Sequence, residues 1–367
     1  MKLTISKETL LEQLTHVVGA VEKKHTSKIL ENILIQATES SLKLVGTDLE
    51  IEMSSQFPIQ SEIGGQITAP ARKLFEICKA LPAEWSVIFE TEKDRLHIKG
   101  VRSRFELATL PADEYPLLDD IPIKNEINIP EKDFKALLEK VSFSMANQDV
   151  RYYLNGMLLE IENNKLLSVS TDGHRLAVSE LQFDNQSSES IKIIVPRKGI
   201  LELSRLLDST SELPIVLQIS DNHIRINKDN IRFTSKLIDG KYPDYQAAIP
   251  SNSTHSIQLN KNDFKNTLAR VSILSNEKFR GIRLKLLDGL MTLHSNNPEN
   301  ESAEEELDIE YSDSLFEIGF NVTYLLEAVN HIEDETLNLD LSTPDSSAVL
   351  YSVNDPLTRY VVMPIRL

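Results

Sequence analysis

The stretch STDGHRLAV, residues 170–178, places Asp172, His174 and Arg175 within four positions between apolar residues. An aspartate and a histidine this close could form a general-base pair, which requires a nucleophile oriented beside it. The alternative is structural. Asp-Gly is a common hairpin turn, because glycine accepts a positive φ and the aspartate side chain binds nearby backbone.

The rest of the chain offers no partner for a catalytic pair. There is no G-x-S-x-G sequence and no G-x-x-x-x-G-K-[ST] or G-x-G-x-x-G loop, and the eight histidines show no pair at metal-ligand spacing. The one cysteine, Cys78, lies in the helical setting KLFEICKAL and is interpreted as a core residue. These absences favour a non-enzymatic binding or scaffold protein without metal or cofactor. A hydrolase built on Asp172 and His174 stays open as an alternative.

Composition limits the class of protein. The 367 residues are 41% hydrophobic, which suffices for two or three domains with real cores. The net charge of −17 argues against a generally basic nucleic-acid binder, unless the basic residues gather on one surface. One cysteine excludes an internal disulfide, and neither a signal peptide nor an apolar run of about 20 residues is evident. We therefore expect a cytoplasmic protein.

Three segments of the chain begin alike, at intervals of about 125 to 130 residues. LTISKETLLEQLTHVV, INIPEKDFKALLEKVS and IQLNKNDFKNTLARVS each predict a short strand followed by an amphipathic helix, with Leu10, Phe134 and Phe264 at the same place. The interval is the size of a domain. The repeat therefore predicts three domains, which we place at residues 1–124, 125–252 and 253–367.

Two more matches recur in each third. TAPARKLFEICKAL, IVPRKGILELSRLL and IGFNVTYLLEAVNHI align at Pro70, Pro196 and Asn321, residue types that suit a helix start. SRFELATLP, IRFTSKLID and TRYVVMPIR predict a closing strand. Each domain is thus expected to contain two helices packed on antiparallel sheets, which is an α+β fold.

The opening stretch has counterparts in the other two repeats. Thr47-Asp48, Thr171-Asp172 and Asn296-Asn297 all fall between two strands of one predicted hairpin. The simplest interpretation of Asp172 is therefore a turn former. His174 and Arg175 occur only in the middle repeat and have no equivalents in the turns of the other two.

Several motifs together closely resemble one protein family. FSMANQDVRYYLNGMLLE, TDGHRLAV, IVPRKG, DGKYPDY, LSNEKFRGIRL and YVVMPIRL are similar to the bacterial DNA polymerase III beta subunits, the sliding clamps, in order over essentially the whole chain. The resemblance implies three clamp domains per chain, two chains joined head to tail, and a six-domain ring around duplex DNA. It also implies a processivity factor that an ATP-driven clamp loader loads and that tethers polymerases. An acidic peptide-binding adaptor that does not encircle DNA is the alternative.

The resemblance implies DNA contacts as well. Lys24, Gln148, Tyr152 and Tyr153 match positions where the family touches DNA, although HTSKIL stands where relatives often have a proline-containing loop. A phosphate contact suits the lysine and a sugar or base contact suits the tyrosines, unless one tyrosine belongs to the core. The basic residues expected at the inner surface are Arg72, Lys73, Arg197 and Lys198.

In the family, TDGHRL lines a groove with the domain linker and the C-terminal tail, where clamp loader, polymerases and other replication and repair proteins insert a short apolar peptide. The terminal RYVVMPI also reads as a last strand, and both descriptions can hold. After YPDY this chain has Gln246-Ala247-Ala248 where relatives often have an arginine, so we expect a basic contact to be lost at the rim. The implied groove residues are Leu154, Thr171, Gly173, His174, Arg175, Leu176, Pro243, Ser347, Val361, Val362, Met363, Pro364 and Arg366.

The dimer contact follows from the same resemblance. It is an edge-to-edge strand pairing with an apolar centre and a charged rim. The apolar residues are Ile273 and Leu274 of one chain against Phe105 and Leu107 of the other. The charged residues are Glu301, Glu304 and Glu305 against Lys73, Arg102 and Arg104.

Overall fold

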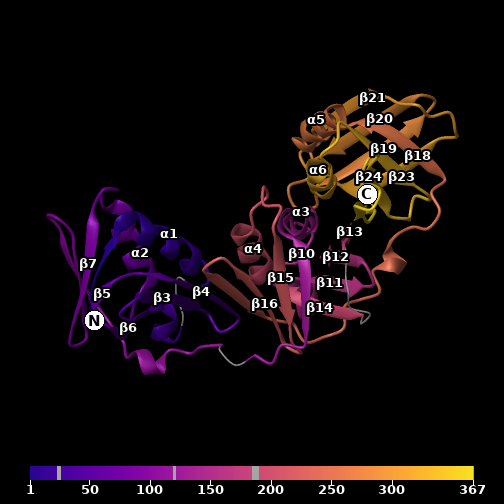
Figure 1. Ribbon diagram of the computed structural model, residues 1–367. Coiled ribbons are helices and arrows are strands. Elements are labelled where there is room, and N and C mark those ends of the chain that lie inside the picture. The colour runs from indigo at the N-terminus through magenta and orange to yellow at the C-terminus, as the bar shows by residue number, and fades with distance from the viewer. Residues whose placement is uncertain (23–25, 119–120, 184–189, 367) are drawn as a thin grey trace. The chain divides into compact units, whose positions relative to one another are not determined.

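The computed structural model describes residues 1–22, 26–118, 121–183 and 190–366, and these form two compact units (Figure 1). Unit 1 comprises Met1–Asp133 and Lys198–Leu237, and unit 2 comprises Phe134–Arg197 and Ile238–Leu367. Each unit therefore combines parts of more than one sequence repeat.

Unit 1 holds a five-stranded sheet in the order β5-β1-β7-β8-β9 and an eight-stranded sheet in the order β10-β15-β16-β17-β4-β3-β2-β6, with all neighbours antiparallel. Its elements are β1 (Lys2–Ser6), α1 (Lys7–Val18), β2 (Asn32–Ala37), β3 (Ser41–Thr47), β4 (Ile51–Pro58), β5 (Ser61–Ile63), β6 (Gly65–Pro70), α2 (Ala71–Ala80), β7 (Ser86–Glu92), β8 (Arg95–Lys99), β9 (Arg104–Ala108), β10 (Asn125–Pro130), α4 (Arg197–Leu206), β15 (Pro214–Ile219), β16 (His223–Lys228) and β17 (Ile231–Lys236).

Unit 2 holds an eight-stranded sheet in the order β14-β11-β12-β13-β25-β24-β23-β18 and a four-stranded sheet in the order β21-β20-β19-β22, again antiparallel. Its elements are α3 (Glu131–Ser142), β11 (Gly156–Glu162), β12 (Lys165–Thr171), β13 (Arg175–Gln182), β14 (Ile191–Pro196), β18 (His255–Asn260), α5 (Lys261–Ser272), β19 (Gly281–Leu287), β20 (Leu290–Asn296), β21 (Ser302–Asp308), β22 (Phe316–Asn321), α6 (Val322–His331), β23 (Thr336–Leu341), β24 (Ala348–Ser352) and β25 (Arg359–Val362).

The α+β class and the repeat are confirmed by these elements. The three strand–helix openings are β1-α1, β10-α3 and β18-α5, and Leu10, Phe134 and Phe264 are all fully buried. Helix α1 packs on β3 and β4, and α5 packs in the same way on β20 and β21. The helix starts also occur where expected, although Pro70 precedes α2 as its N-cap and does not lie in its first turn.

The two eight-stranded sheets each join strands of different repeats. In unit 1, the last strand of the second repeat, β17, pairs with β4 of the first, with Phe233 opposite Met53. In unit 2, the last strand of the third repeat, β25, pairs with β13 of the second, with Val361 opposite Leu176. Consecutive domains are therefore joined by backbone hydrogen bonds as well as by side chains.

Strands β9 and β21 stand at sheet ends, as do β5, β6, β10, β14, β18 and β22 among the described residues. Among the described residues, β9 pairs only with β8, and β21 pairs only with β20. Strand β9 closes the first repeat as β17 and β25 close the others, whereas β21 occupies in the third repeat the place of β4 and β13. Among the end strands, β9 and β21 are thus the two whose counterparts in the other repeats pair across a joint.

The β3–β4 and β12–β13 turns have the same hydrogen bonds. Oδ1 of Asp48 accepts the amides of Glu50 and Ile51, and Oδ1 of Asp172 accepts those of His174 and Arg175. Leu49, with φ of 77°, occupies the left-handed position that glycine takes in the second turn, where φ is 88°. The interpretation of Asp172 as a turn former is therefore correct.

The first linker is attached to its domain by the buried Tyr115. The Tyr115 hydroxyl accepts the Thr47 amide at 3.1 Å, and the carbonyl oxygens of Asn32 and Val45 lie 3.2 Å from it. The ring packs against Leu34 and Val45. Burial raises the pKa of Tyr115, so the hydroxyl stays protonated and able to donate.

Replacing Tyr115 with phenylalanine leaves the buried Thr47 amide without its acceptor, which should cost about 1–3 kcal/mol. Trp85 is the only tryptophan and lies in the same unit, so its fluorescence during urea unfolding reports this loss as a lower midpoint. A Tyr311→Phe control, in unit 2, should leave the Trp85 midpoint unchanged. An unchanged midpoint in Tyr115→Phe would show that the hydroxyl contributes nothing.

Candidate functional site

The predicted groove residues meet where β13 and β25 pair. Leu154, Leu176 and Val361 belong to one buried apolar cluster in unit 2. The linker after β17 completes this cluster through Tyr242, while Tyr245 packs against it half-buried. Sequence elements more than 200 residues apart are thus brought to one place.

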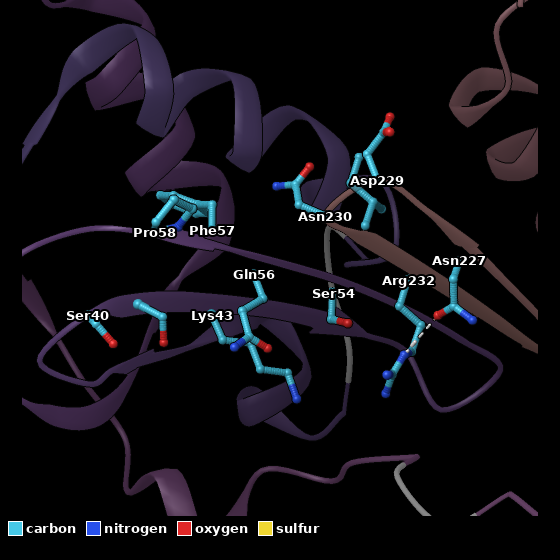
Figure 2. A pocket seen from close by; sticks show the side chains of 12 residues that line it. Ser40, Lys43, Ser54, Gln56, Phe57, Pro58, Asn227, Asp229, Asn230 and Arg232 are labelled. Carbon is cyan, nitrogen blue, oxygen red and sulfur yellow. Dashed lines mark hydrogen bonds between the residues drawn. The ribbon is translucent and has the colours of Figure 1, made fainter.

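Two hollows open beside this cluster. One of about 410 Å³ is lined by Leu167, Val178, Tyr245 and Ile249, and one of about 500 Å³ includes Pro243. Gln246 lines both, so the position where a basic residue was expected to be lost does face the groove. A third hollow, of about 450 Å³ and mainly polar, lies in unit 1 (Figure 2).

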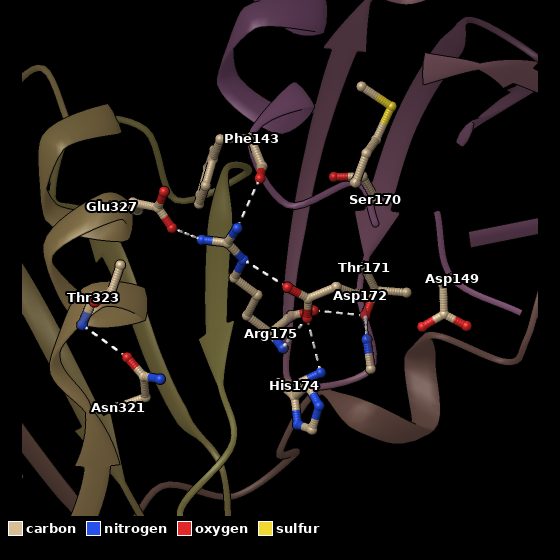
Figure 3. A network of polar contacts seen from close by, with 12 residues as sticks. Phe143, Asp149, Ser170, Thr171, Asp172, His174, Arg175, Asn321, Thr323 and Glu327 are labelled. Atoms are coloured by element: carbon tan, nitrogen blue, oxygen red, sulfur yellow. Dashed lines mark hydrogen bonds and ion pairs between the residues drawn. The ribbon is translucent and has the colours of Figure 1, made fainter. Parts of the chain in front are cut away.

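Arg175 is held by partners from three elements (Figure 3). Its guanidinium donates to Asp172 at 3.1 Å, to the Phe143 carbonyl at 2.9 Å, and to Glu327 of α6. It also lies 4.8 Å from the ring centre of Tyr324. Its donors are therefore engaged within the chain, and Arg175 joins elements of the second and third repeats. Its direct peptide contact stays a prediction.

The C-terminal segment is fixed beside the turn. The Met363 amide donates to the His174 carbonyl at 2.9 Å, and the Ile365 amide donates to the Gly319 carbonyl at 2.8 Å. The His174 ring stacks on Tyr324, with centroids 6.2 Å apart. Met363 remains 37% exposed. The expectation that the tail is both a last strand and part of the groove wall is thus consistent with its geometry.

The remaining groove residues fall into two groups. The buried ones are Thr171 and Val362, and the Thr171 hydroxyl donates to the Arg175 carbonyl within the turn. The half-buried or exposed ones are Gly173, Ser347, Pro364 and Arg366. Thr171 and Val362 therefore shape the groove without reaching its surface.

Several lining residues were missed by the sequence analysis. Val178, Tyr351 and Ile249 contact the cluster, and Tyr324 and Glu327 complete the Arg175 network. The apolar run Leu176-Ala177-Val178 in the sequence could have indicated that Val178 lies in the cluster. No local signal indicates Glu327, because it lies 152 residues from Arg175.

The candidate DNA-contacting loop is partly described. Lys24 lies outside the described residues. Gln148 is exposed with φ of 59°, and Tyr152 is 57% exposed. Tyr153 is half-buried against the groove cluster, and the two tyrosine rings meet edge to face at 5.7 Å. One tyrosine is thus available to a ligand and the other belongs largely to the core.

The basic residues expected at the inner surface divide in a similar way. Arg72 and Lys73 of α2 are exposed. Arg197 donates to the Met145 carbonyl at 2.9 Å, and Lys198 forms an ion pair with Asp48. Lys198 therefore joins the second repeat to the first, and its charge is largely neutralised there.

The residues assigned to the dimer contact lie at the two sheet edges or next to one. Strand β9 carries the exposed Arg104, the half-buried Phe105 and the buried Leu107, with Arg102 exposed just before it. Ile273, directly after α5, is 75% exposed, and Leu274 is half-buried.

The three assigned acids lie on or beside β21. Glu301 precedes this strand, and Glu304 and Glu305 lie within it. Arg270 donates two hydrogen bonds to Glu305, at 2.7 and 2.8 Å, and lowers the pKa of that carboxyl. Glu305 is therefore already paired within its own chain. The assignment of Glu305 to the dimer contact, facing Arg102 or Arg104, did not anticipate this pairing.

The part of the chain that the structure describes shows neither a candidate metal site nor a membrane-spanning helix. No group of three or more histidine, cysteine, aspartate or glutamate side chains there could hold a metal ion. No helix in that part is long and apolar enough to cross a membrane.

Three family models match the chain in succession: the N-terminal domain of the DNA polymerase III beta subunit over residues 1–119, its central domain over 128–244 and its C-terminal domain over 246–366. Proteins described as beta sliding clamps from Vibrio cholerae and Escherichia coli are 43% and 44% identical over the full length of both chains. The crystal structure of DNA polymerase III subunit beta from Pseudomonas aeruginosa superposes with a TM-score of 0.96 at 43% identity, covering both chains completely.

A clamp subunit of three related domains is therefore the class that the fold defines. The chain belongs to the DNA polymerase III beta subunit family, the bacterial beta sliding clamps.

His331 gives the Arg175 network a pH dependence. Its ring stacks on Phe143 at 4.0 Å, and burial, followed by the nearby Arg175 charge, lowers the pKa of His331 below 6.5. The unfolded state therefore binds more protons, and the free energy of unfolding falls as the pH drops through 6.5. The loss is at most about 1.4 kcal/mol for each unit by which the folded-state pKa of His331 lies below its unfolded value.

Hydrogen exchange of β25 and α6 measures this effect, once corrected for intrinsic rates. Protection should fall between pH 7.5 and pH 5.5 in the natural protein and change less in His331→Gln. His16, whose pKa burial also lowers, lies in unit 1 and provides the control as His16→Gln. Equal pH dependence in natural protein and His331→Gln would contradict the assignment.

Proposed function

We propose that this protein is a DNA sliding clamp, a non-enzymatic processivity factor that encircles duplex DNA as a head-to-tail homodimer and tethers polymerases. The observation that carries the proposal is that β9 and β21 end their sheets, although the corresponding strands of the other repeats pair with each other as β17 with β4 and β25 with β13. A second chain would pair its β21 with β9 of the first, as β4 pairs with β17 and β13 with β25. Head-to-tail contacts of this kind must close into a ring or continue as a filament.

Side chains support the same third joint. Each joint within the chain places a β-turn residue against a helix of the next domain: Lys198, at the start of α4, contacts Asp48, and Glu327, in the middle of α6, contacts Arg175. The remaining helix of this type, α2, begins with the exposed Arg72 and Lys73. The remaining turn carries Glu301, so the third pairing joins opposite charges across the two chains.

The charge of −17 is compatible with this function. A closed ring retains DNA by topology and needs no strong phosphate contacts. Screening over about 8 Å at physiological salt hides distant outer acids from the DNA. Gln148 and Tyr152 would contact the duplex without sequence readout, together with the cations of α2.

The apolar groove is the proposed docking site for polymerase, clamp loader and other replication and repair proteins. Two or three buried aliphatic or aromatic anchors contribute roughly 1.5–3 kcal/mol each, and ordering costs reduce this to a micromolar affinity. Such affinity permits exchange among partners. One solved relative, the sliding clamp of Pseudomonas aeruginosa, is described with bound griselimycin, at 43% identity and a TM-score of 0.93.

Three further assignments belong to this proposal. The domains are placed at residues 1–124, 125–252 and 253–367, and the protein works in the cytoplasm. We assign no catalytic role to Asp172 and His174, because the Asp172 carboxylate is occupied by two backbone amides and Arg175. The adaptor alternative shares the groove but leaves the edges of β9 and β21 unexplained.

Two measurements test the clamp function. Negative-stain class averages of the purified protein should show a closed ring of six lobes. Protein loaded on nicked circular DNA by a clamp loader should remain bound until the circle is cut, and then be lost. Retention that does not change on linearisation would favour the adaptor.

Replacing Leu274 with alanine should weaken the dimer without unfolding the domains. A loss of about 1.5 kcal/mol at each of two identical interfaces gives about 3 kcal/mol per ring, which raises the dimer Kd roughly a hundredfold. Sedimentation at nanomolar chain concentration measures it, with Leu213→Ala, a 73% exposed leucine elsewhere, as control. An unaltered Kd would place the interface elsewhere.

Deleting residues 363–367 should abolish binding of a polymerase-tail peptide and leave the dimer intact. The deletion removes Met363 and Pro364 from the groove wall but retains the β13–β25 pairing, which ends at Val362. Fluorescence anisotropy should show at least a tenfold weaker Kd, while gel filtration shows no change. Undiminished peptide affinity would refute the groove assignment.

A further inference from the structure

The polar hollow of unit 1 lies beside the joint between the first two repeats (Figure 2). Its cations lie on the sheet face opposite α1, while Asn230, which also lines the hollow, donates to Gln13 of α1. The Ser55 hydroxyl faces α1, where it contacts Gln13 at 2.5 Å, so Ser54 and Gln56 point to the other side of β4. These two side chains form the floor of the hollow, and Lys43 and Arg232 line it from the strands on either side.

This hollow is the counterpart of the 410 Å³ apolar hollow in unit 2. The aligned turns place Lys43 where unit 2 has Leu167, and Ser54 where it has Val178. The aligned last strands place Asn230 where unit 2 has Leu357. The aligned arginines, Arg232 and Arg359, line both. The same site in the fold thus occurs twice, once with a more apolar lining and once with a lining richer in hydroxyl, amide and cationic side chains.

The two cations of the polar hollow lack acidic partners. Within the described part of the chain, neither Lys43 nor Arg232 forms an ion pair, although the sequence has 56 acidic and 39 basic residues. Arg232 instead donates through Nε to the Asn227 side chain at 3.2 Å. Asp229 lines the hollow, but Figure 2 shows its carboxylate pointing away from both cations.

The unit 2 site is different in this respect. There, the lining includes one acid, Glu180, beside one cation, Arg359. Glu180 also pairs at 2.9 Å with Lys165 outside the lining, and Lys192 in the adjacent hollow pairs with Glu160 at 2.7 Å. The hollow of unit 1 is therefore complementary to a negatively charged ligand, whereas its counterpart is charge-balanced.

The spacing of the cations defines the shape of that ligand. Lys43 lies opposite Gln56, and Arg232 lies opposite Ser54, so the cations are two strand spacings apart across the sheet and two residues apart along it. This places them roughly 12 Å apart, close to the rise of four residues of an extended peptide. Side chains four residues apart in a strand point to the same side. Two carboxylates on an extended peptide match this backbone spacing, whereas a single phosphate would require both long side chains to converge on it.

We propose that this hollow, the acidic-peptide groove, binds an extended segment of a partner protein that carries two carboxylates four residues apart. The carboxylates bind Lys43 and Arg232, and Ser54 and Gln56 bind the peptide backbone between them. The site is additional to the apolar groove, so a partner could occupy one, the other or both.

Fluorescence anisotropy with the full-length protein at low salt tests this proposal. The probe is the labelled peptide GSEGSGEGS, which has its glutamates four residues apart and no apolar anchor. The variant Lys43→Gln/Arg232→Gln should bind at least fivefold more weakly. The matched control, Lys28→Gln/Lys124→Gln, removes two exposed cations of the same unit outside the groove and should remain within twofold.

Other readouts separate the alternatives. The peptide GSQGSGQGS should bind the natural protein at least fivefold more weakly than the glutamate peptide. An apolar polymerase-tail peptide should bind Lys43→Gln/Arg232→Gln unchanged, which shows that the protein is folded and the second groove intact. Equal affinity of the glutamate peptide for natural protein and this variant would overturn the proposal. Displacement of the probe by pyrophosphate at lower concentration than by unlabelled peptide would also overturn it, in favour of a phosphate ligand.

Discussion

The structure depends on one constraint: the edge of an antiparallel strand must find a partner or be protected. In this chain the edge of one domain is covered by the last strand of the next, through β17 on β4 and β25 on β13. An open edge of this length is a template for association. Three repeats in one chain form two such pairings and leave one unpaired strand edge in the first repeat, on β9, and one in the third, on β21. The proposed assembly of two chains therefore follows from the same rule that joins the domains.

The turn that begins at Asp172 shows how one short stretch can serve several purposes. Asp172 shapes the turn through two backbone amides and also holds Arg175, which in turn reaches Glu327 and the Phe143 carbonyl. The His174 carbonyl receives the Met363 amide on the other side. The wall of the apolar groove and the joint between two domains therefore share their residues. A ligand in the proposed groove would contact a surface whose residues the joint also fixes.

Local features of the fold could be predicted because they arise from contacts within about ten residues. The helix openings follow from apolar periodicity, and the three turns follow from Asp and Asn side chains that bind their own backbone. The order of strands across domains was not predictable, because β-pairing alone does not reveal which of several alternating strands lie adjacent. Arg175 illustrates the limit: its partner Glu327 is 152 residues away.

The same limit applies to charge. The sequence around a lysine at a helix start is the same whether the lysine binds a phosphate or a carboxylate. Only the folded chain shows that Lys198 pairs with Asp48. The groove, DNA-contacting and dimer residues came from resemblance to a family. The structure brings Leu154, Leu176 and Val361 together. It also assigns Arg175, Lys198 and Glu305 to partners within the chain.

Joints made of backbone hydrogen bonds also bear on divergence. Every amino acid except proline carries the same amide and carbonyl, so a sheet that continues across a domain boundary survives almost any replacement of its outward side chains. This is consistent with a TM-score of 0.96 at 43% identity to the clamp of Pseudomonas aeruginosa. After a triplication, copies of one surface site are then free to drift apart chemically while their scaffold stays fixed. The apolar and polar hollows of this chain are two outcomes of that freedom.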